Sequence, residues 1–87
     1  MSYRLSLRPD ATDSLKKLDK TAANNILKKL KWLTENAENA AHRSLSGDLK
    51  GFYKLRVGDY RAIYKLNRDE QMIVLYFVGH RRDVYTL

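Results

Sequence analysis

Residues 52–66 of this chain read Phe-Tyr-Lys-Leu-Arg-Val-Gly-Asp-Tyr-Arg-Ala-Ile-Tyr-Lys-Leu, and this stretch decides the fold. Gly58-Asp59 separates two runs that are rich in aromatic and branched residues. A glycine in the first position of a two-residue loop is typical of a type II′ hairpin turn. The stretch therefore predicts a β-hairpin in which Val57 faces Tyr60 and the pairing continues outward from them.

One face of this predicted hairpin is apolar and the other is cationic, because paired residues share a face and neighbours along a strand alternate. The apolar face carries Tyr53, Leu55, Val57, Tyr60, Ala62, Tyr64 and Leu66. The cationic face carries Phe52, Lys54, Arg56, Arg61, Ile63 and Lys65. Arg56 and Arg61 stand directly opposite one another, and like charges in this position destabilise a strand pair. Four cations without a carboxylate indicate a site for an external anion, and Phe52 adds a ring on which a base can stack. A merely solvated outer face is the alternative.

The N-terminal half predicts a strand and two helices. Residues 2–7 alternate as a strand, and Asp10 is placed to cap a short helix. Asp19 or Thr21 then caps a longer helix whose buried stripe consists of Ala23, Ile26, Leu30, Leu33 and Ala37. Trp32 lies roughly 150° from the centre of that stripe, among exposed lysines. It either packs against the shorter helix or is an exposed anchor for a protein partner, since Trp is enriched at binding hot spots.

The C-terminal half adds only strands. Residues 36–51 are predicted to form a connecting loop, and residues 71–79 form a last, apolar strand after the hairpin. The resulting order is β-α-α-β-β-β. This order predicts an α+β domain over residues 1–87, with a helical hairpin packed on one face of an antiparallel sheet. The other sheet face stays open to solvent or substrate.

Composition narrows the function classes. Apolar residues make up 44% of the 87 residues, which argues against intrinsic disorder. Cysteine is absent, which excludes disulfide frameworks, thiol nucleophiles and Cys-ligated metals. No apolar run is long enough to span a bilayer and no signal-peptide pattern is present, so we expect a soluble domain in the reducing cytoplasm. The net charge of +7 favours polyanionic partners, nucleic acid first.

Two motifs carry a family resemblance that covers essentially the whole chain. Residues 45–64 read LSGDLKGFYKLRVGDYRAIY, and residues 78–85 read VGHRRDVY. With the order of elements, these motifs resemble the RelE/ParE superfamily of bacterial and archaeal toxins, and the RelE branch is the closer one. The superfamily holds both messenger-RNA endonucleases and gyrase poisons that lack nuclease activity.

The resemblance to the RelE branch implies five catalytic residues, which by motif position are Lys54, Arg56, Arg61, Arg81 and Tyr85. Arg56 and Arg61 are expected to bind the phosphate and to stabilise charge in the transition state. Arg81 stabilises or protonates the leaving 5′-oxygen, and Tyr85 stacks on or orients a base. Further RNA contacts are assigned to Lys65, Phe52, Lys50 and Arg82.

One position departs from the RelE pattern, which commonly has a second lysine where this chain has Arg56. Arginine stays protonated and cannot take a proton from a hydroxyl. Any general base on the sheet is therefore Lys54, and His80 and the ribosome are the other candidates for that role. His42 and His80 alone, without cysteine, do not make a metal site. No metal or other cofactor is required.

The resemblance implies a toxin of a type II toxin–antitoxin system, namely a ribosome-dependent messenger-RNA endoribonuclease that inhibits translation. The 2′-OH attacks the adjacent phosphodiester and leaves a 2′,3′-cyclic phosphate and a 5′-OH end. The implied partners are a cognate antitoxin, in a heteromeric complex, and the ribosome with messenger RNA, with no membrane. The alternatives are a ParE-like gyrase-inhibiting toxin and a non-catalytic RNA- or ribosome-binding module. Neither alternative needs the combination of Lys54, Arg61, Arg81 and Tyr85.

Overall fold

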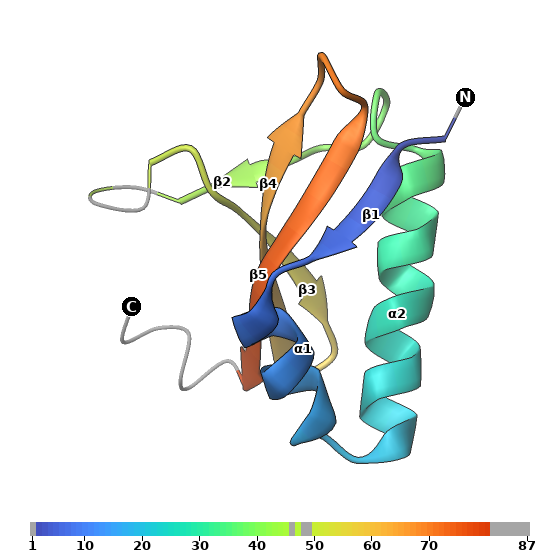
Figure 1. Cartoon of the computed structure of the whole chain (residues 1–87), viewed down its shortest axis with the longest axis vertical. Coiled ribbons are helices and arrows are strands. Elements are labelled where there is room, and N and C mark those ends of the chain that lie inside the picture. The colour runs from blue at the N-terminus through green and yellow to red at the C-terminus, as the bar shows by residue number, and fades with distance from the viewer. Residues whose placement is uncertain (1, 46, 48–49, 81–87) are drawn as a thin grey trace.

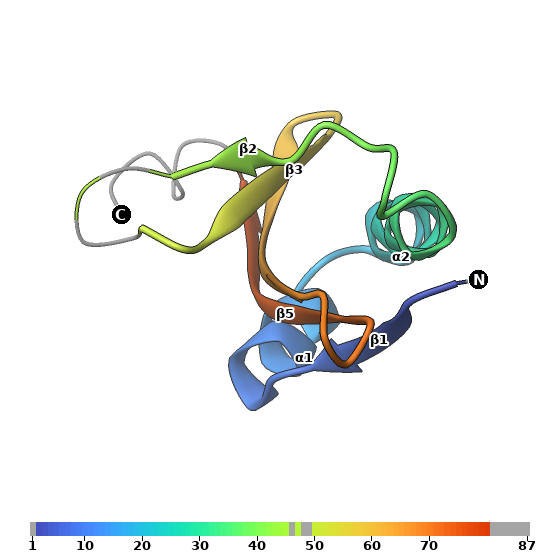
Figure 2. The same cartoon turned by 90° about the horizontal axis from the view of Figure 1, so that it is seen from above.

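The computed structural model describes residues 2–45, 47 and 50–80. Its elements are, in order, β1 (Arg4–Leu7), α1 (Pro9–Lys16), α2 (Lys20–Glu35), β2 (Arg43–Ser44), β3 (Tyr53–Val57), β4 (Tyr60–Asn67) and β5 (Met72–His80). The strands form one sheet in the order β1-β5-β4-β3-β2 (Figure 1). The sheet curves around α2, which is seen nearly end-on on its inner side in Figure 2. In the described part of the chain, no helix is long and apolar enough to cross a membrane.

The central hairpin forms in the predicted register. Val57 pairs with Tyr60 and Arg56 with Arg61, and the ladder continues to Tyr53 and Tyr64. Gly58 has a φ of +59°, whereas Asp59 has no positive φ. This combination is the one that a type II′ turn requires, and it confirms why glycine stands first in the loop.

Two features of the sheet differ from the expected antiparallel sheet. β1 pairs with β5 in parallel, from Arg4 opposite Met72 to Leu7 opposite Leu75, so the sheet is mixed. Alternation in a sequence specifies the face that a strand buries, but it does not specify which edge the strand joins. In addition, β2 forms a two-residue strand against β3 inside the segment 36–51, which was predicted as a loop. A strand this short has no periodicity to detect.

Both helices begin at residues that favour a helix N-terminus, although α1 is not capped by the predicted residue. Pro9 occupies its first turn and Arg8 is the N-cap residue, with no side-chain cap. Proline suits this position because its fixed φ is helical and it has no N–H to satisfy. Asp10 therefore lies inside the first turn instead of capping it. The predicted cap of α2 is confirmed, since the Ala22 N–H donates a 2.7 Å hydrogen bond to Asp19 Oδ1.

The core lies between the inner face of the sheet and the helices. Its buried members are Tyr3, Ala11, Ile26, Leu30, Leu33, Ala37, Ala62, Tyr64, Ile73, Leu75 and Val78. Where β1 ends, α1 continues along the edge of β5, and the Val78 N–H donates to Ser14 Oγ at 3.1 Å. The buried hydroxyl of Ser14 thus replaces a strand partner for one backbone group.

A β-bulge in β5 shapes the outer face of the sheet. Ile63 pairs with Phe77, but its neighbour Tyr64 pairs with Leu75, so Tyr76 is an extra residue between them. A bulge of this kind bends a strand and changes the direction of a side chain. Here it leaves the aromatic residues Tyr76 and Phe77 next to each other in the chain, on the strand beside the cationic face.

Candidate functional site

The predicted cationic face exists and lies opposite the core. Arg56 and Arg61 are direct cross-strand partners, and Lys54 is opposite Ile63 two positions further along β3. Ala62 and Tyr64, which alternate with these residues, are buried in the core. The hairpin therefore brings together three of the five residues proposed as catalytic.

Arg61 is the most unusual of these cations because it is only 5% exposed. Its Nη1 donates hydrogen bonds to the carbonyl oxygens of Tyr60 at 3.0 Å and Gly58 at 3.3 Å. Among the described residues the one ion pair joins Arg68 to Glu38, so no described carboxylate neutralises Arg61. Keeping an uncompensated charge out of water costs several kcal/mol. The site therefore favours a bound anion strongly.

A groove of about 450 Å³ contains these cations. We call it the α2–β3 groove; its basic residues are Lys29, Arg43, Lys54, Arg56 and Arg61, and its apolar residues include Trp32, Leu33 and Leu55. No Asp or Glu of the described residues lines it. A groove lined by both apolar and cationic side chains can hold an acidic amphipathic segment or the backbone of a nucleic acid.

Arg43 is a member of this groove that the sequence analysis missed. It pairs with Lys54 through the short strand β2, and this pairing places both on the same face of the sheet. The only signal in the sequence is its position beside His42 in a segment without periodicity. Arg43 adds a further positive charge beside Lys54, and this charge increases the electrostatic attraction of the groove for an anion.

His42 holds the segment that carries Arg43. Its Nε2 lies 2.8 Å from the Ala37 carbonyl oxygen and its Nδ1 lies 2.6 Å from the Tyr64 hydroxyl. Because a carbonyl can only accept, Nε2 carries the proton and Nδ1 accepts from Tyr64. Burial, with a smaller contribution from Tyr53, raises the pKa of Tyr64 to about 12, so the donor stays protonated. His42 is therefore an anchor of this segment.

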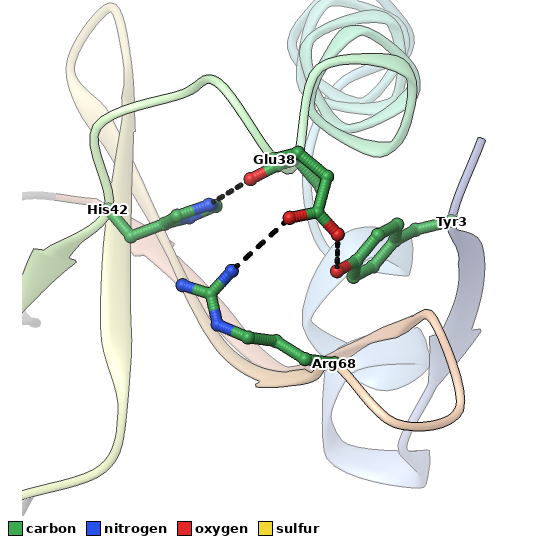
Figure 3. A network of polar contacts seen from close by, with 5 residues as sticks. Tyr3, Glu38, His42 and Arg68 are labelled. Carbon is green, nitrogen blue, oxygen red and sulfur yellow. Dashed lines mark hydrogen bonds and ion pairs between the residues drawn. The ribbon is translucent and has the colours of Figure 1, made fainter. Parts of the chain in front are cut away.

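A neighbouring network ties the same segment to two other parts of the fold (Figure 3). The Tyr3 hydroxyl donates to Glu38 Oε1, and Glu38 Oε2 lies 3.7 Å from Nη1 of Arg68. The hydrogen bond to the Glu38 carboxylate raises the pKa of Tyr3, because the carboxylate stabilises the protonated phenol. Residues 37–42 are thus fixed to the residue preceding β1 and to the turn after β4.

Trp32 is exposed and does not pack against the shorter helix. Its side chain is 44% exposed and lines the α2–β3 groove. The Lys29 Nζ lies 4.1 Å from the centre of its ring, which is a cation–π contact. Of the two alternatives for Trp32, the structure agrees with the exposed one.

The other proposed residues are distributed differently. Phe52 and Lys65 lie at the far end of the cationic face, where the Lys65 Nζ is 4.5 Å from the Phe52 ring centre. Lys50 is exposed in the turn before β3 and does not line the groove. Arg81, Arg82 and Tyr85 lie outside the described residues.

His80 lies on the opposite side of the sheet from Arg61. It pairs with Tyr60, a residue of the core face, and the two rings meet edge to face with centres 5.8 Å apart. This position argues against His80 as the acid or base for a phosphate bound at Arg61. The described residues contain no group of three or more His, Asp or Glu side chains placed to hold a metal ion.

Comparison with known proteins gives consistent matches. The family model of the ParE toxin of type II toxin–antitoxin systems matches residues 5–85. A RelE-like toxin protein of Escherichia coli is 33% identical over an alignment of 91 positions. This alignment covers 100% of this chain and 94% of that protein.

Two solved structures have the same fold. A variant of the E. coli toxin RelE in complex with a peptide of the antitoxin RelBc is 27% identical, with a TM-score of 0.74, and the match covers 99% of this chain and 93% of that chain. The RelBE2 toxin–antitoxin complex of Mycobacterium tuberculosis gives a TM-score of 0.84 over 93% of both chains, and its 22% identity supports the fold alone.

Proposed function

Since the chain belongs to the RelE/ParE superfamily of type II toxins, we propose that it is a ribosome-dependent messenger-RNA endoribonuclease that inhibits translation. The observation that carries the proposal is Arg61, a 5% exposed cation without a described carboxylate partner, which faces Arg56 across the ladder. Two arginines at one point of a sheet suit a phosphodiester, because guanidinium groups bind phosphate oxygens with paired hydrogen bonds.

The proposed reaction needs a base, a phosphate clamp and a stabilised leaving group. Lys54, in its neutral form, accepts the proton of the 2′-OH while that oxygen bonds to phosphorus. Arg56 and Arg61 stabilise the charge that builds on the phosphoryl oxygens. The bond from phosphorus to the 5′-oxygen then breaks, and Arg81 stabilises this oxygen until it takes up a proton from solvent. The products are a 2′,3′-cyclic phosphate and a 5′-OH end, and Tyr85 is assigned to orient a base.

We further propose that a cognate antitoxin inactivates the protein by occupying the α2–β3 groove. Lys54 and Arg61 lie in the same groove as Trp32, so an acidic segment anchored on Trp32 covers the proposed catalytic cations. The RelE and RelBE2 structures matched above contain RelB-type antitoxins in their complexes. Competition for one surface requires no conformational change in the toxin.

The experiment that tests the nuclease proposal is mapping of RNA 5′ ends after a pulse of expression, with Lys54→Ala and the surface control Lys28→Ala beside the wild type. We expect cuts at fixed positions within codons for the wild type and for Lys28→Ala, and their loss for Lys54→Ala. Lys28 is an exposed residue of α2 outside the groove, so it controls for the loss of one charge.

A second candidate function follows from the ParE description of the matching family model. If the chain is a gyrase-directed toxin, DNA breaks should appear in the same samples while the messenger RNAs stay intact. This outcome, in cells that express wild-type protein, overturns the nuclease proposal. Binding of RNA with neither kind of break points to a non-catalytic module.

A further inference from the structure

A second hollow lies beside the end of β4, at a distance from the α2–β3 groove along the same strand. β3 begins at Tyr53, so the last residues of β4 have a strand neighbour only on the β5 side. The hollow beside this free edge has a volume of about 480 Å³, and its lining includes Lys65, Asn67, Asp69, Val74 and Tyr76. We call it the Tyr76 hollow. Its size lies within the usual range for small-molecule sites.

Tyr76, which lines the hollow, belongs to an aromatic pair that has cations against it. The rings of Phe52 and Tyr76 meet edge to face, with centres 5.0 Å apart. The Lys65 Nζ lies 4.5 Å from the centre of the Phe52 ring and 5.7 Å from that of Tyr76. The guanidinium of Arg8 lies 5.7 Å from the centre of the Tyr76 ring. Four segments distant in the sequence thus converge on one stacking surface.

This surface is continuous with the proposed cleavage site. Lys65 and Arg61 share a face of β4 and are four residues apart, which corresponds to about 13 Å along an extended strand. Phe52 and Lys54 are likewise two positions apart on β3, or about 7 Å. A chain that has a phosphate at Arg61 therefore reaches the Tyr76 hollow with a neighbouring nucleotide.

The chemistry of the hollow fits a nucleobase better than an acidic peptide. Aromatic rings stack on bases of any sequence, and adjacent cations add to the attraction. Asn67 and Asp69 at the rim supply donors and acceptors for the edge of a base. The Asp69 carboxylate repels an acidic side chain but accepts hydrogen bonds from a base amino group. Arg68, which also lines the hollow, is paired with Glu38 and adds no net charge.

We propose that the Tyr76 hollow binds the base of a nucleotide that flanks the cleaved phosphate in single-stranded RNA. The proposal rests on the proposed function for its position, because it assigns the phosphate at Arg61 and the base at Tyr76 to one RNA chain. Tyr76 stacks on the base, Phe52 supports the Tyr76 ring, and Lys65 and Arg8 contact the adjoining phosphates.

The test is equilibrium binding of a 2′-O-methylated RNA heptanucleotide, which cannot be cleaved, to the full chain. Tyr76→Leu removes the ring and keeps an apolar side chain. Tyr60→Leu is the matched control, because Tyr60 is also half-buried but lies on the core face of the hairpin. We expect Tyr76→Leu to weaken binding about 5- to 150-fold, as is usual for loss of one base stack. Tyr60→Leu is expected to bind like the wild type, and Tyr76→Phe to keep most of the affinity.

Two further measurements separate stacking from charge. An abasic site at one position of the RNA should weaken binding to the wild type and have no further effect on Tyr76→Leu. Lys65→Gln should reduce the slope of log affinity against log salt by about 0.7, the value for one phosphate contact to a single strand, whereas Tyr76→Leu should leave the slope unchanged.

The outcomes distinguish this proposal from the nuclease proposal, because the binding assay involves no cleavage. If Tyr76→Leu and the wild type bind RNA equally, or if the wild type binds none, the hollow is not a base site. Wild-type cleavage on ribosomes in that case leaves the proposed function standing. If RNA binding depends on Tyr76 but no RNA is cut, the base site stands and the nuclease assignment fails. Tyr76-dependent binding of a polyglutamate peptide, with RNA binding unaffected, assigns the hollow to a protein partner and overturns the proposal.

Discussion

Replacing Arg61 with Met removes a buried charge and keeps an unbranched side chain. Two hydrogen bonds from Arg61 Nη1, to Tyr60 and Gly58, are lost, and bonds from a charged donor contribute about 1.5–3 kcal/mol each. Gly58 is exposed, so water can replace the lost donor at its carbonyl. The opposing gains are relief from two costs: the desolvation of a charge that has no ion-pair partner among the described residues, several kcal/mol, and the repulsion from Arg56 across the ladder.

These opposing contributions are similar in size, so we expect the free energy of unfolding of Arg61→Met to lie within about 1 kcal/mol of the wild type, or above it. In a domain of this size, 1 kcal/mol corresponds to about 4–8 °C in Tm. The same substitution should slow single-turnover cleavage on programmed ribosomes by about 10²- to 10³-fold, the usual cost of removing one group that stabilises an oxyanion.

The measurement is guanidinium denaturation together with the cleavage rate per folded molecule, with Arg4→Met on β1 as a control outside the site. Arg4 is exposed, so its substitution should change neither quantity. A fall of about 3 kcal/mol or more in stability, with an unchanged cleavage rate per folded molecule, would refute the reasoning. Arg61 would then be a structural clamp of the β3–β4 turn.

Four shorter predictions concern other residues. Lys54→Arg keeps the charge but cannot accept a proton, so it should lose about 10²- to 10⁴-fold in cleavage rate. An unchanged rate places the base elsewhere. Trp32→Ala should weaken antitoxin binding, measured by calorimetry, by about 2 kcal/mol or more. Its Tm should change little because Trp32 is 44% exposed. A lower Tm with intact antitoxin binding would instead show that Trp32 is a core residue. Arg81→Ala should relieve the growth arrest while circular dichroism shows a folded protein, and full toxicity of that protein contradicts its assigned role. Because burial raises the pKa of Tyr64 to about 12, the folded state keeps a proton that the unfolded chain releases near pH 10. Stability should therefore fall between pH 10 and 12 by about 2–3 kcal/mol more in the wild type than in Tyr64→Phe, and equal falls contradict the assignment.

The hairpin and its cationic face could be predicted from sequence because they depend on local information. A two-residue turn with glycine first sets the register, and a period of two then assigns every side chain from Tyr53 to Tyr64 to a face. The burial of Arg61 could not be predicted in this way. Its position on an outer face suggests exposure, but its guanidinium folds back onto the carbonyls of the adjacent turn.

The features that sequence reasoning missed depend on contacts between distant segments. β1 joins β5 in parallel because of how the helices connect it to the sheet, and no residue of β1 encodes that neighbour. Arg43 enters the groove through a strand of two residues whose position is held by His42 and Tyr64. The bulge at Tyr76 interrupts the alternation that the prediction relies on.

The proposed roles explain why the fold retains charges that work against it. Arg56 and Arg61 repel one another across the ladder, and Arg43 and Lys54 do the same one strand further out. Cations that have no ion-pair partner among the described residues lower the stability of the free protein, and any anion that binds them recovers part of that cost. RNA phosphate and the acidic residues of an antitoxin are then alternative counter-charges for one groove. Because Trp32 offers an apolar anchor beside those cations, a protein partner can gain affinity there that an RNA backbone does not gain. Under the proposed roles, the antitoxin therefore binds this groove more tightly than RNA does, while both use the same cations.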